Sequence, residues 1–255
     1  MARVLVAGES WNTLSIHTKG FDSFTTSAYV EGVHDFQAAL EAEGHSVIHQ
    51  PCHVAADHFP DTPADLVRFD VVVLSDIGSN TLLLPARTFV DAEVGANRLV
   101  TLRDWVFSGG ALAMVGGYLS FQGIEAKANY RSTALADVLP VELEHGDDRE
   151  ETPEGCAITT TDVEHPITAG LDAVWPPVLG FQRFTAKPDA HVLATIEDHA
   201  VLVVGTFGQG RVLAFATDIG PHWAPRRFTE WSGFRQLWGG AMRWLAGEES
   251  AATHD

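Results

Sequence analysis

The segment Phe69–Ser75, FDVVVLS, decides the fold class of this chain. Its uninterrupted Val and Leu side chains are typical of a parallel strand that is buried on both faces. Arg3–Gly8 and Ala111–Val115 are apolar in the same way, and Ser46–His49 is a shorter strand candidate. The pattern therefore predicts four strands of one mostly parallel sheet.

Segments with helical spacing of apolar residues separate these strands. Tyr29–Glu43 is the first, and Gly44 stands where a helix C-cap is expected. Thr62-Pro63 predicts an N-cap followed by a short helical turn. Asn97–Ser108 and Thr229–Ala246 are later helices, whose expected buried residues are Leu99, Leu102, Val106, Phe107, Phe234, Leu237, Trp238, Met242 and Leu245. This alternation predicts a three-layer, doubly wound α/β fold of the flavodoxin type.

The second half of the chain changes character. Val192–Ile196, Val201–Phe207 and Arg211–Ala216 are strand candidates joined by turns of only three residues, Glu197-Asp198-His199 and Gly208-Gln209-Gly210. Turns of that length connect antiparallel strands, so we expect an antiparallel extension at the C-terminal side of the sheet.

Composition limits the function classes. No stretch approaches the about 18 apolar residues of a membrane-spanning helix, so we expect a soluble cytoplasmic protein without a membrane partner. The formal charge of −18 would repel a phosphate backbone, which excludes nucleic acid as a partner. The acidic run 142–154 predicts a solvated loop. No linker divides the sequence, and we expect one domain over residues 1–248 with a flexible tail over 249–255.

A ligand site is expected beyond the carboxyl ends of the strands, where open α/β sheets bind their ligands. The first segment to fall there is predicted to be a long loop that runs through Phe21, Asp22, Phe24 and Thr25. The other segments follow Ser75, Val115 and Ala216. The residues expected to contact a ligand are Ser10, Trp11, Gly78, Ser79, Asn80, Gly116, Gly117, Tyr118, Asp218 and Trp223.

Glu9, Asp76 and His222 are the candidate catalytic residues. Both carboxylates follow buried strands, so they are expected to converge on one cleft, where paired carboxyl groups can divide acid and base roles. The alternative is that each carboxylate caps the segment that follows it. A ligand contact and a packing role are both open for His222. Serines near the same rim, Ser10, Ser79 and Ser120, are candidate nucleophiles or turn-capping residues.

Three stretches resemble the uncharacterised glutamine amidotransferase-like proteins: FDVVVLSDIG (69–78), GGALAMVGGYLSFQG (109–123) and ATDIGPHW (216–223). The resemblance covers Val4–Leu245 and extends distantly to the ThuA-like group. It implies the class I glutamine amidotransferase fold, in which a Cys at a strand-to-helix elbow attacks an amide while a His, oriented by a Glu, takes its proton.

This sequence departs from that pattern at two of the three positions. The elbow reads Val115-Gly116-Gly117-Tyr118-Leu119, so Gly117 stands where the nucleophilic Cys is expected. The late motif reads His222-Trp223-Ala224 and keeps the His but not the Glu. Cys52 and Cys156 lie in other segments, away from the elbow. The resemblance therefore implies a fold whose standard glutaminase chemistry is absent.

Metal and cofactor sites are not expected. His45, His49 and His53 are spaced by four residues, but Gly44 and Pro51 disfavour the helix that would place them on one face. Several aromatic residues near loops predict an interface and a homo-oligomer: Trp11, Phe121, Phe181, Phe184, Trp223 and Trp231.

Three functions remain open from the sequence. One is a crevice that binds, or acts on, a small polar metabolite beside Glu9, Asp76 and His222. Another is a non-catalytic relative, a pseudoenzyme, that serves assembly or ligand sensing. The third, which the resemblance implies, is a glutamine amidotransferase that uses a non-standard nucleophile.

Overall fold

The computed structural model describes residues 1–248, and the predicted tail 249–255 lies outside the described residues. Its centre is an eight-stranded sheet in the order β4-β1-β5-β6-β14-β13-β12-β9. In chain order, these strands are β1 (Arg3–Gly8), β4 (Ser46–Gln50), β5 (Val71–Ser75), β6 (Ala111–Val115), β9 (Thr159–Thr160), β12 (His191–Ile196), β13 (His199–Phe207) and β14 (Gly210–Phe215).

The sheet is parallel from β4 to β14 and antiparallel beyond β14. The parallel strands follow the order 2-1-3-4-5 of flavodoxin-like folds, which confirms the predicted fold class and its antiparallel extension. Every residue of β5 and β6 is buried because helices cover both faces of these central strands.

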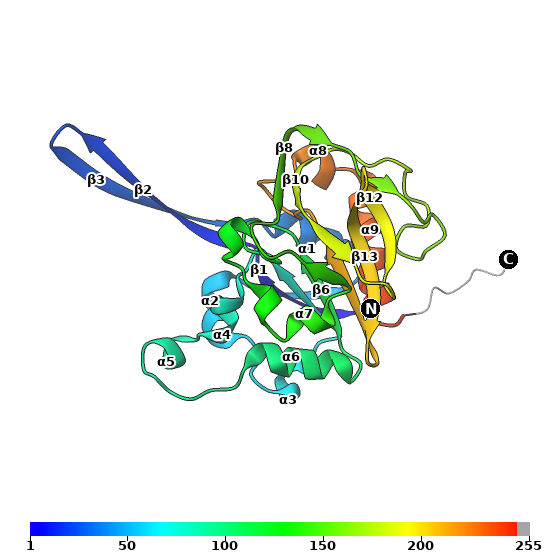
Figure 1. Cartoon of the computed structure of the whole chain (residues 1–255), viewed down its shortest axis with the longest axis horizontal. Helices are drawn as coiled ribbons and strands as arrows, with labels where there is room; N and C mark the ends of the chain where they lie inside the picture. Colours follow the sequence, from blue (N-terminus) through cyan, green and yellow to red (C-terminus); the bar gives the residue numbers. More distant parts are fainter. Residues whose placement is uncertain (249–255) are drawn as a thin grey trace.

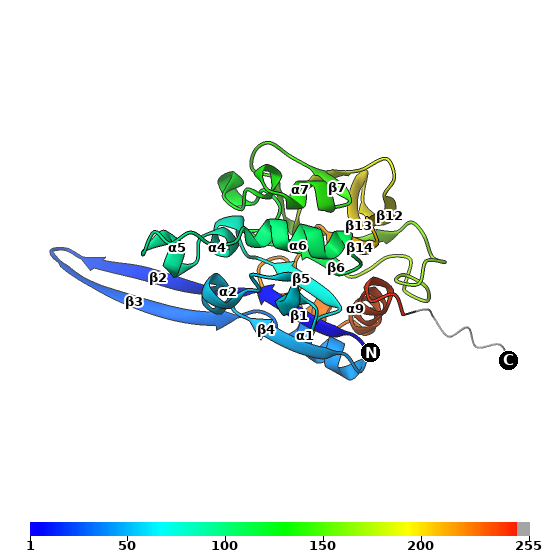
Figure 2. The same cartoon turned by 90° about the horizontal axis from the view of Figure 1, so that it is seen from below.

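Helices on the two faces complete the three layers (Figure 2). On one face, α1 (His34–Ala42) packs against α9 (Ser232–Leu245). On the other face, α4 (Ser79–Leu83) contacts both α2 (Cys52–His58) and α6 (Arg98–Phe107). The shorter helices are α3 (Pro63–Leu66), α5 (Ala86–Phe89), α7 (Leu135–Val138), α8 (Arg226–Thr229) and two 3-10 turns, η1 (Ile124–Ala126) and η2 (Tyr130–Ser132).

The N-cap predicted at Thr62 and the helix end predicted at Gly44 are confirmed, and Asn97 is a further cap that was not predicted. The Thr62 side chain accepts a hydrogen bond from the Asp65 amide. Asn97 caps α6 through the amides of Leu99 and Val100. Gly44 follows the end of α1 with a φ of 84°, the left-handed conformation expected there.

Three helix predictions were wrong in part. The helix expected at Tyr29 begins only at His34, because the residues before it belong to a strand. Phe107 was expected on the buried face of α6 but is 58% exposed, since it lies at the end of that helix. The last helix is divided into α8 and α9, and Trp231 occupies the N-cap position of α9.

The acidic run 142–154 is not the solvated loop that we predicted. It contains β7 (Val141–Leu143), paired with β11 (Phe184–Ala186), and β8 (Arg149–Cys156), paired with β10 (Val178–Gln182). Asp148 within it is fully buried. This region therefore forms part of the packed structure near the strand ends.

The long loop predicted after β1 is instead a two-stranded antiparallel hairpin, β2 (Ser10–Lys19) and β3 (Asp22–Glu31). It contains Phe21, Asp22, Phe24 and Thr25, and it projects from the body of the protein as a long ribbon (Figures 1 and 2). Its base is closed by a hydrogen bond from the Gly32 amide to the Glu9 carbonyl, 2.9 Å long. The backbone groups of each strand form their hydrogen bonds with the other strand, so this segment is regular β-structure and not an irregular loop.

Candidate functional site

The ends of four strands place the candidate residues along one edge of the sheet. Glu9 follows β1, Asp76 follows β5, Gly117 lies just beyond β6, and Asp218 follows β14. Glu9 and Asp76 have positive φ angles of 48° and 43°, and His222 has one of 95°. Side chains other than glycine rarely adopt this conformation, and such strain gathers at functional sites.

Three carboxyl groups are buried together at this edge. Glu9 and Asp218 are fully buried, and Asp76 is 8% exposed. The Ser75 hydroxyl donates to Glu9 Oε2 at 2.6 Å, and the Leu119 amide donates to Asp76 Oδ1 at 2.7 Å.

Asp218 Oδ1 accepts hydrogen bonds from the amides of Ile219 and Gly220, at 2.7 and 3.1 Å. The remaining oxygens are less well satisfied: within residues 1–248, Glu9 Oε1 and Asp218 Oδ2 have no hydrogen-bond partner. No Lys or Arg of the described chain forms an ion pair with any of the three carboxyl groups.

The electrostatic result is that burial raises the pKa of all three carboxyl groups. Burial, followed by the charge of Asp76, raises the pKa of Glu9 to about 8, and the Ser75 hydrogen bond only partly offsets this. Burial also raises the pKa of Asp76, against the opposing effects of the Leu119 amide and His222. The pKa of Asp218 is raised well above its ordinary value by burial and by the charges of Glu9 and Asp76. With a pKa of about 8, Glu9 is mostly protonated near neutral pH and can donate a proton.

Two glycines make room for the Glu9 carboxyl group. A Cβ atom added to Gly32 would lie 2.6 Å from Glu9 Oε1, and one added to Gly220 would lie 2.8 Å from the same oxygen. Both glycines also line a surface pocket of about 460 Å³, together with His222. The backbone at Gly32 and Gly220 thus lies between the buried Glu9 side chain and this pocket.

Aromatic rings surround His222 at the mouth of the site. The Trp11 ring lies 4.6 Å from the His222 ring, and the Tyr118 ring lies 5.5 Å from it. Tyr118 in turn lies 5.6 Å from Trp223. His222 itself is exposed, whereas Trp223 is 1% exposed. The structure therefore brings four of the predicted residues into one cluster.

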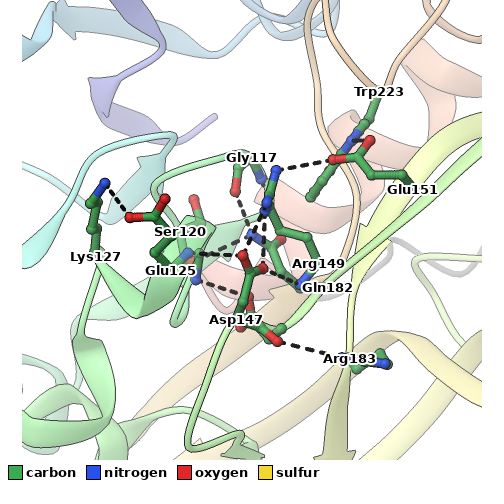
Figure 3. A network of polar contacts seen from close by, with 12 residues as sticks. Gly117, Ser120, Glu125, Lys127, Asp147, Arg149, Glu151, Gln182, Arg183 and Trp223 are labelled. Carbon is green, nitrogen blue, oxygen red and sulfur yellow. Dashed lines mark hydrogen bonds and ion pairs between the residues drawn. The ribbon is translucent and has the colours of Figure 1, made fainter.

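A polar network from β8 borders this cluster (Figure 3). The Arg149 guanidinium lies 4.8 Å from the centre of the Tyr118 ring and forms an ion pair with Asp147 at 3.0 Å. The Trp223 indole donates to Glu151 Oε2 at 3.0 Å. Arg149 and Glu151 were not among the predicted site residues, because their segment was interpreted as a solvated loop.

The elbow after β6 has no room for a side chain. Gly117 has a φ of 144°, and a Cβ atom there would lie 2.8 Å from Asp76 Cβ. The Gln182 side chain donates to the Gly117 carbonyl and accepts from the Gly117 amide at 3.3 Å. The elbow is therefore closed by Asp76 on one side and held by Gln182.

Comparison with known proteins agrees with this geometry. Residues 3–247 match the family model described as "putative glutamine amidotransferase". The chain belongs to that family. This confirms the resemblance found in the sequence, while no curated protein matches the chain.

Solved structures place this glutamine amidotransferase-like protein among bacterial relatives. A cytoplasmic protein from Salmonella typhimurium is 42% identical with a TM-score of 0.93, covering 95% of this chain and 98% of its own. A cytoplasmic protein from S. typhimurium LT2 is 44% identical with a TM-score of 0.92, covering 95% and 99%. A ThuA-like protein from Parabacteroides merdae, 10% identical with a TM-score of 0.60 over 98% and 91%, shares the fold alone.

Cys52 lies closer to the crevice of this amidotransferase-like protein than we predicted. Its amide donates to Ser10 Oγ at 2.8 Å, and its Sγ lies 3.7 Å from the Asp76 carbonyl. Burial raises the pKa of the Cys52 thiol, with smaller contributions from Asp76 and Glu9 that the Ser10 hydrogen bonds oppose. The thiol is thus held in its protonated, weakly nucleophilic form.

The capping alternative for the two carboxylates was wrong. Asp76 accepts from the Leu119 amide, which belongs to another loop, and α4 begins at Ser79 with Gly78 at its N-cap position and no side-chain cap. Glu9 is followed by β2, so it has no helix to cap. Both side chains instead point to the shared buried cluster.

The serines are occupied in ways that disfavour a serine nucleophile. Ser10 Oγ accepts from Cys52, and Ser120 Oγ accepts from the Asp76 amide at 3.0 Å. In the part of the chain that the structure describes, no serine is hydrogen-bonded to the His222 ring.

The turn Gly78-Ser79-Asn80 lies against a different segment. The Ser79 amide donates to the Ala128 carbonyl at 3.0 Å, and Gly78 faces Ala128 and Lys127. Ser79 is buried, and Asn80 is exposed. Among residues 1–248, no hydrogen bond joins these three residues to the rings around His222, so their ligand role stays a prediction.

Metal binding has no support from the arrangement of side chains. Across residues 1–248, no group of three or more His, Cys, Asp or Glu side chains is arranged to hold a metal ion. His49 Nε2 instead contacts the Gly8 carbonyl at 2.9 Å, at the end of β1.

Proposed function

We propose that this protein binds a small polar metabolite in the pocket beside His222, and that the buried carboxyl groups of Glu9, Asp76 and Asp218, behind the backbone of Gly32 and Gly220, make this binding depend on pH. The observation that carries the proposal is that three carboxyl groups are buried at the strand ends without a Lys or Arg partner. Such an arrangement costs stability, and groups with strongly shifted pKa values gather at functional sites.

The pocket lining suggests the chemistry of the ligand. Its titratable residues are Glu31, Asp35, His34, His222 and Arg226, with Gly32 and Gly220 between them. The pocket has two carboxylates and two imidazoles but only one guanidinium, so it offers little positive charge to a strong anion. This lining favours a ligand with an amino group or several hydroxyl groups. A volume of about 460 Å³ suits a small metabolite.

Amide hydrolysis by the usual thiol mechanism does not fit this site. Gly117 has no side chain, Asp76 fills the space beside it, and the Leu119 amide already donates to Asp76. The elbow therefore offers a glutamine substrate no nucleophile, and the Leu119 amide is not free to stabilise an oxyanion. We therefore propose that the family relationship records ancestry and that the site here serves another ligand.

The cellular location is proposed from the relatives. Both Salmonella proteins are described as cytoplasmic, and we propose the same location for this protein. Among the described residues, no helix is both long enough and apolar enough to span a bilayer.

The test is a thermal-shift and calorimetric screen with free amino acids, polyamines, polyols and monosaccharides. A binding compound at about 100 times its dissociation constant stabilises the folded state by ~2.7 kcal/mol. His222→Ala should remove that stabilisation, whereas His199→Ala, which changes an exposed histidine outside the pocket, should keep it. A bound compound whose affinity is unchanged in His222→Ala would disprove the proposed site.

A second variant tests the carboxyl cluster. Glu9→Gln should leave the compound bound but change how its affinity depends on pH, because the titrating group is removed. The same pH dependence in Glu9→Gln and in the unchanged protein would show that the buried acids take no part.

A further inference from the structure

The hairpin β2–β3 presents a large surface that the body of the protein does not use. We define the arm as residues 12–30, of which all but Ser15 are exposed. It projects away from the sheet in both views (Figures 1 and 2). With strands of ten residues at about 3.3 Å each, it reaches roughly 30 Å from its base.

A two-stranded ribbon of this length is not expected to be stable by itself in water. Isolated hairpins are marginal, because each face lacks a layer to pack against and each edge leaves its backbone groups unpaired. The arm also lacks the usual protection against pairing, since it contains no proline and only one lysine, Lys19. These features indicate that a partner covers it.

The arm differs from the rest of the chain in charge. Lys19 and Asp22 are its only Lys, Arg, Asp or Glu residues, so its formal charge is zero, while the whole chain carries −18. Two copies of the chain would repel each other through most other surfaces. A second copy can approach the neutral arm without this electrostatic repulsion.

Apolar side chains lie on both faces of the arm. Leu14 and Ile16 share one face and are 68% and 71% exposed. Phe24 lies on the other face, stacked at 4.6 Å on His17, and is 50% exposed. Hydroxyl side chains alternate with them, at Thr13, Ser15, Thr18, Ser23, Thr25, Thr26, Ser27 and Tyr29.

We propose that the arm is a homodimerisation element that packs on a second copy of this chain. In a two-fold dimer each copy contributes its own arm of 19 residues and the surface that the other arm covers. Together these reach the roughly 20–30 residues per side of a standard interface. We assign the receiving surface to the region around α5, which lies on the side of the body from which the arm extends (Figures 1 and 2). Phe89 in α5 and Val90 just after it are exposed.

This interface replaces the one that we predicted from aromatic residues. Phe121, Phe181, Phe184 and Trp223 are each less than 9% exposed, so they belong to the core and cannot form a partner surface. The homo-oligomer remains a prediction, now assigned to the arm. It does not depend on the proposed ligand, since none of the arm residues lines the pocket beside His222.

Sedimentation velocity of the full chain tests the proposal, with the double variant Leu14→Lys/Ile16→Lys. The unchanged protein should sediment as a dimer at micromolar concentration, and the variant as a monomer with the same far-ultraviolet circular dichroism. The matched control is Val163→Lys/Val174→Lys, two exposed valines outside the arm, which should stay dimeric. A monomeric unchanged protein, or a variant that remains dimeric, would overturn the proposal.

A membrane surface is the competing partner for an apolar hairpin tip. Flotation with neutral phosphatidylcholine vesicles distinguishes it: we expect the protein to stay unbound. Binding to vesicles that Phe21→Ser abolishes, with a monomer in solution, would assign the arm to a lipid surface and overturn the dimer. Because Leu14, Ile16 and Phe21 do not line the pocket beside His222, these variants should retain ligand binding there, so failure of the dimer and failure of the ligand site are separate outcomes.

Discussion

Asp76 occupies the space that a side chain at Gly117 would need. A Cβ atom on Gly117 would lie 2.8 Å from Asp76 Cβ and 3.0 Å from Asp76 Oδ1. Because Asp76 already fills the space beside Gly117, a single substitution at Gly117 should not create a thiol site.

Gly117→Cys should release no ammonia from glutamine and should lower the free energy of unfolding by about 2–4 kcal/mol. The cost combines a positive φ with overpacking against a buried carboxyl group. Urea unfolding and an ammonia assay measure the two effects. Gly146→Cys is the matched control, because a Cβ atom there meets nothing within 4 Å. Ammonia release by Gly117→Cys would contradict the closed elbow.

The pH dependence of stability should be unusual. The ordinary pKa of Glu9 is 4.5 and its folded pKa is about 8, so between these values the folded protein keeps a proton that the unfolded chain has lost. The contribution of Glu9 to the free energy of unfolding is therefore greatest up to about pH 4.5. It falls as the pH rises from there to about 8, and it levels off above that pH. The pKa values of Asp76 and Asp218 are raised as well, which strengthens the trend.

Urea unfolding at pH 5.5 and pH 8.5 measures this effect. The free energy of unfolding should differ by a few kcal/mol, because each tenfold difference in proton affinity between the folded and unfolded states is worth ~1.4 kcal/mol. In Glu9→Gln the slope should be smaller, and the variant should be the more stable protein at pH 8.5. Equal stability of the unchanged protein at both pH values would show that ionising the buried carboxyl groups does not destabilise the folded protein.

Cys52 should react slowly with iodoacetamide at pH 7. Burial raises the pKa of its thiol, which lowers the fraction present as the reactive thiolate. In a Cys156→Ala background only one thiol remains, so mass spectrometry follows Cys52 alone. We expect alkylation at least about tenfold slower than in the same protein unfolded in urea. Equal rates in the two states would mean that the thiol is solvated and available as a nucleophile.

Asp148 should be a structural residue of the loop after the elbow. It is fully buried and accepts from the amides of Gln122 and Gly123, at 2.9 and 2.8 Å, while Phe121 and Gly123 both have positive φ angles. Asp148→Ala should lower the free energy of unfolding by about 2 kcal/mol or more, because two buried amides lose their acceptor. Asp148→Asn should cost less, since its carbonyl oxygen keeps one bond.

The control for this experiment is Glu144→Ala, an exposed acidic residue of the same segment, which should change stability by less than ~0.5 kcal/mol. If Asp148→Ala proved as stable as this control, the loop would be held by other contacts.

Local patterns predicted the elements that local physics determines. The strand Phe69–Ser75, the cap at Thr62 and the turn at Gly44 were all found as predicted, within two residues at each boundary. These features depend on neighbouring side chains and on backbone conformation, which the sequence contains directly.

The hairpin and the acidic segment were missed for a different reason. Ser10–Glu31 is rich in hydroxyl groups and lacks a sustained alternation of apolar and polar residues, so it was interpreted as a loop. Its strands form because each pairs with the other along ten residues, from Ser10↔Glu31 to Lys19↔Asp22. Strand β8 likewise depends on pairing with β10, which lies far along the chain.

The sequence by itself determined the parallel α/β fold and the loss of the elbow nucleophile, because apolar runs and the presence of glycine at 117 are local facts. The convergence of Glu9 and Asp76 on one edge of the sheet also followed from the sequence. Only the tertiary structure decided that Asp218 joins them in a buried cluster, that Cys52 lies beside it and that residues 12–30 project as an arm. The pKa of a carboxyl group depends on the charges and solvent around it in space, and residues as distant as Glu9 and Asp218 become neighbours only when β1 and β14 join the same sheet.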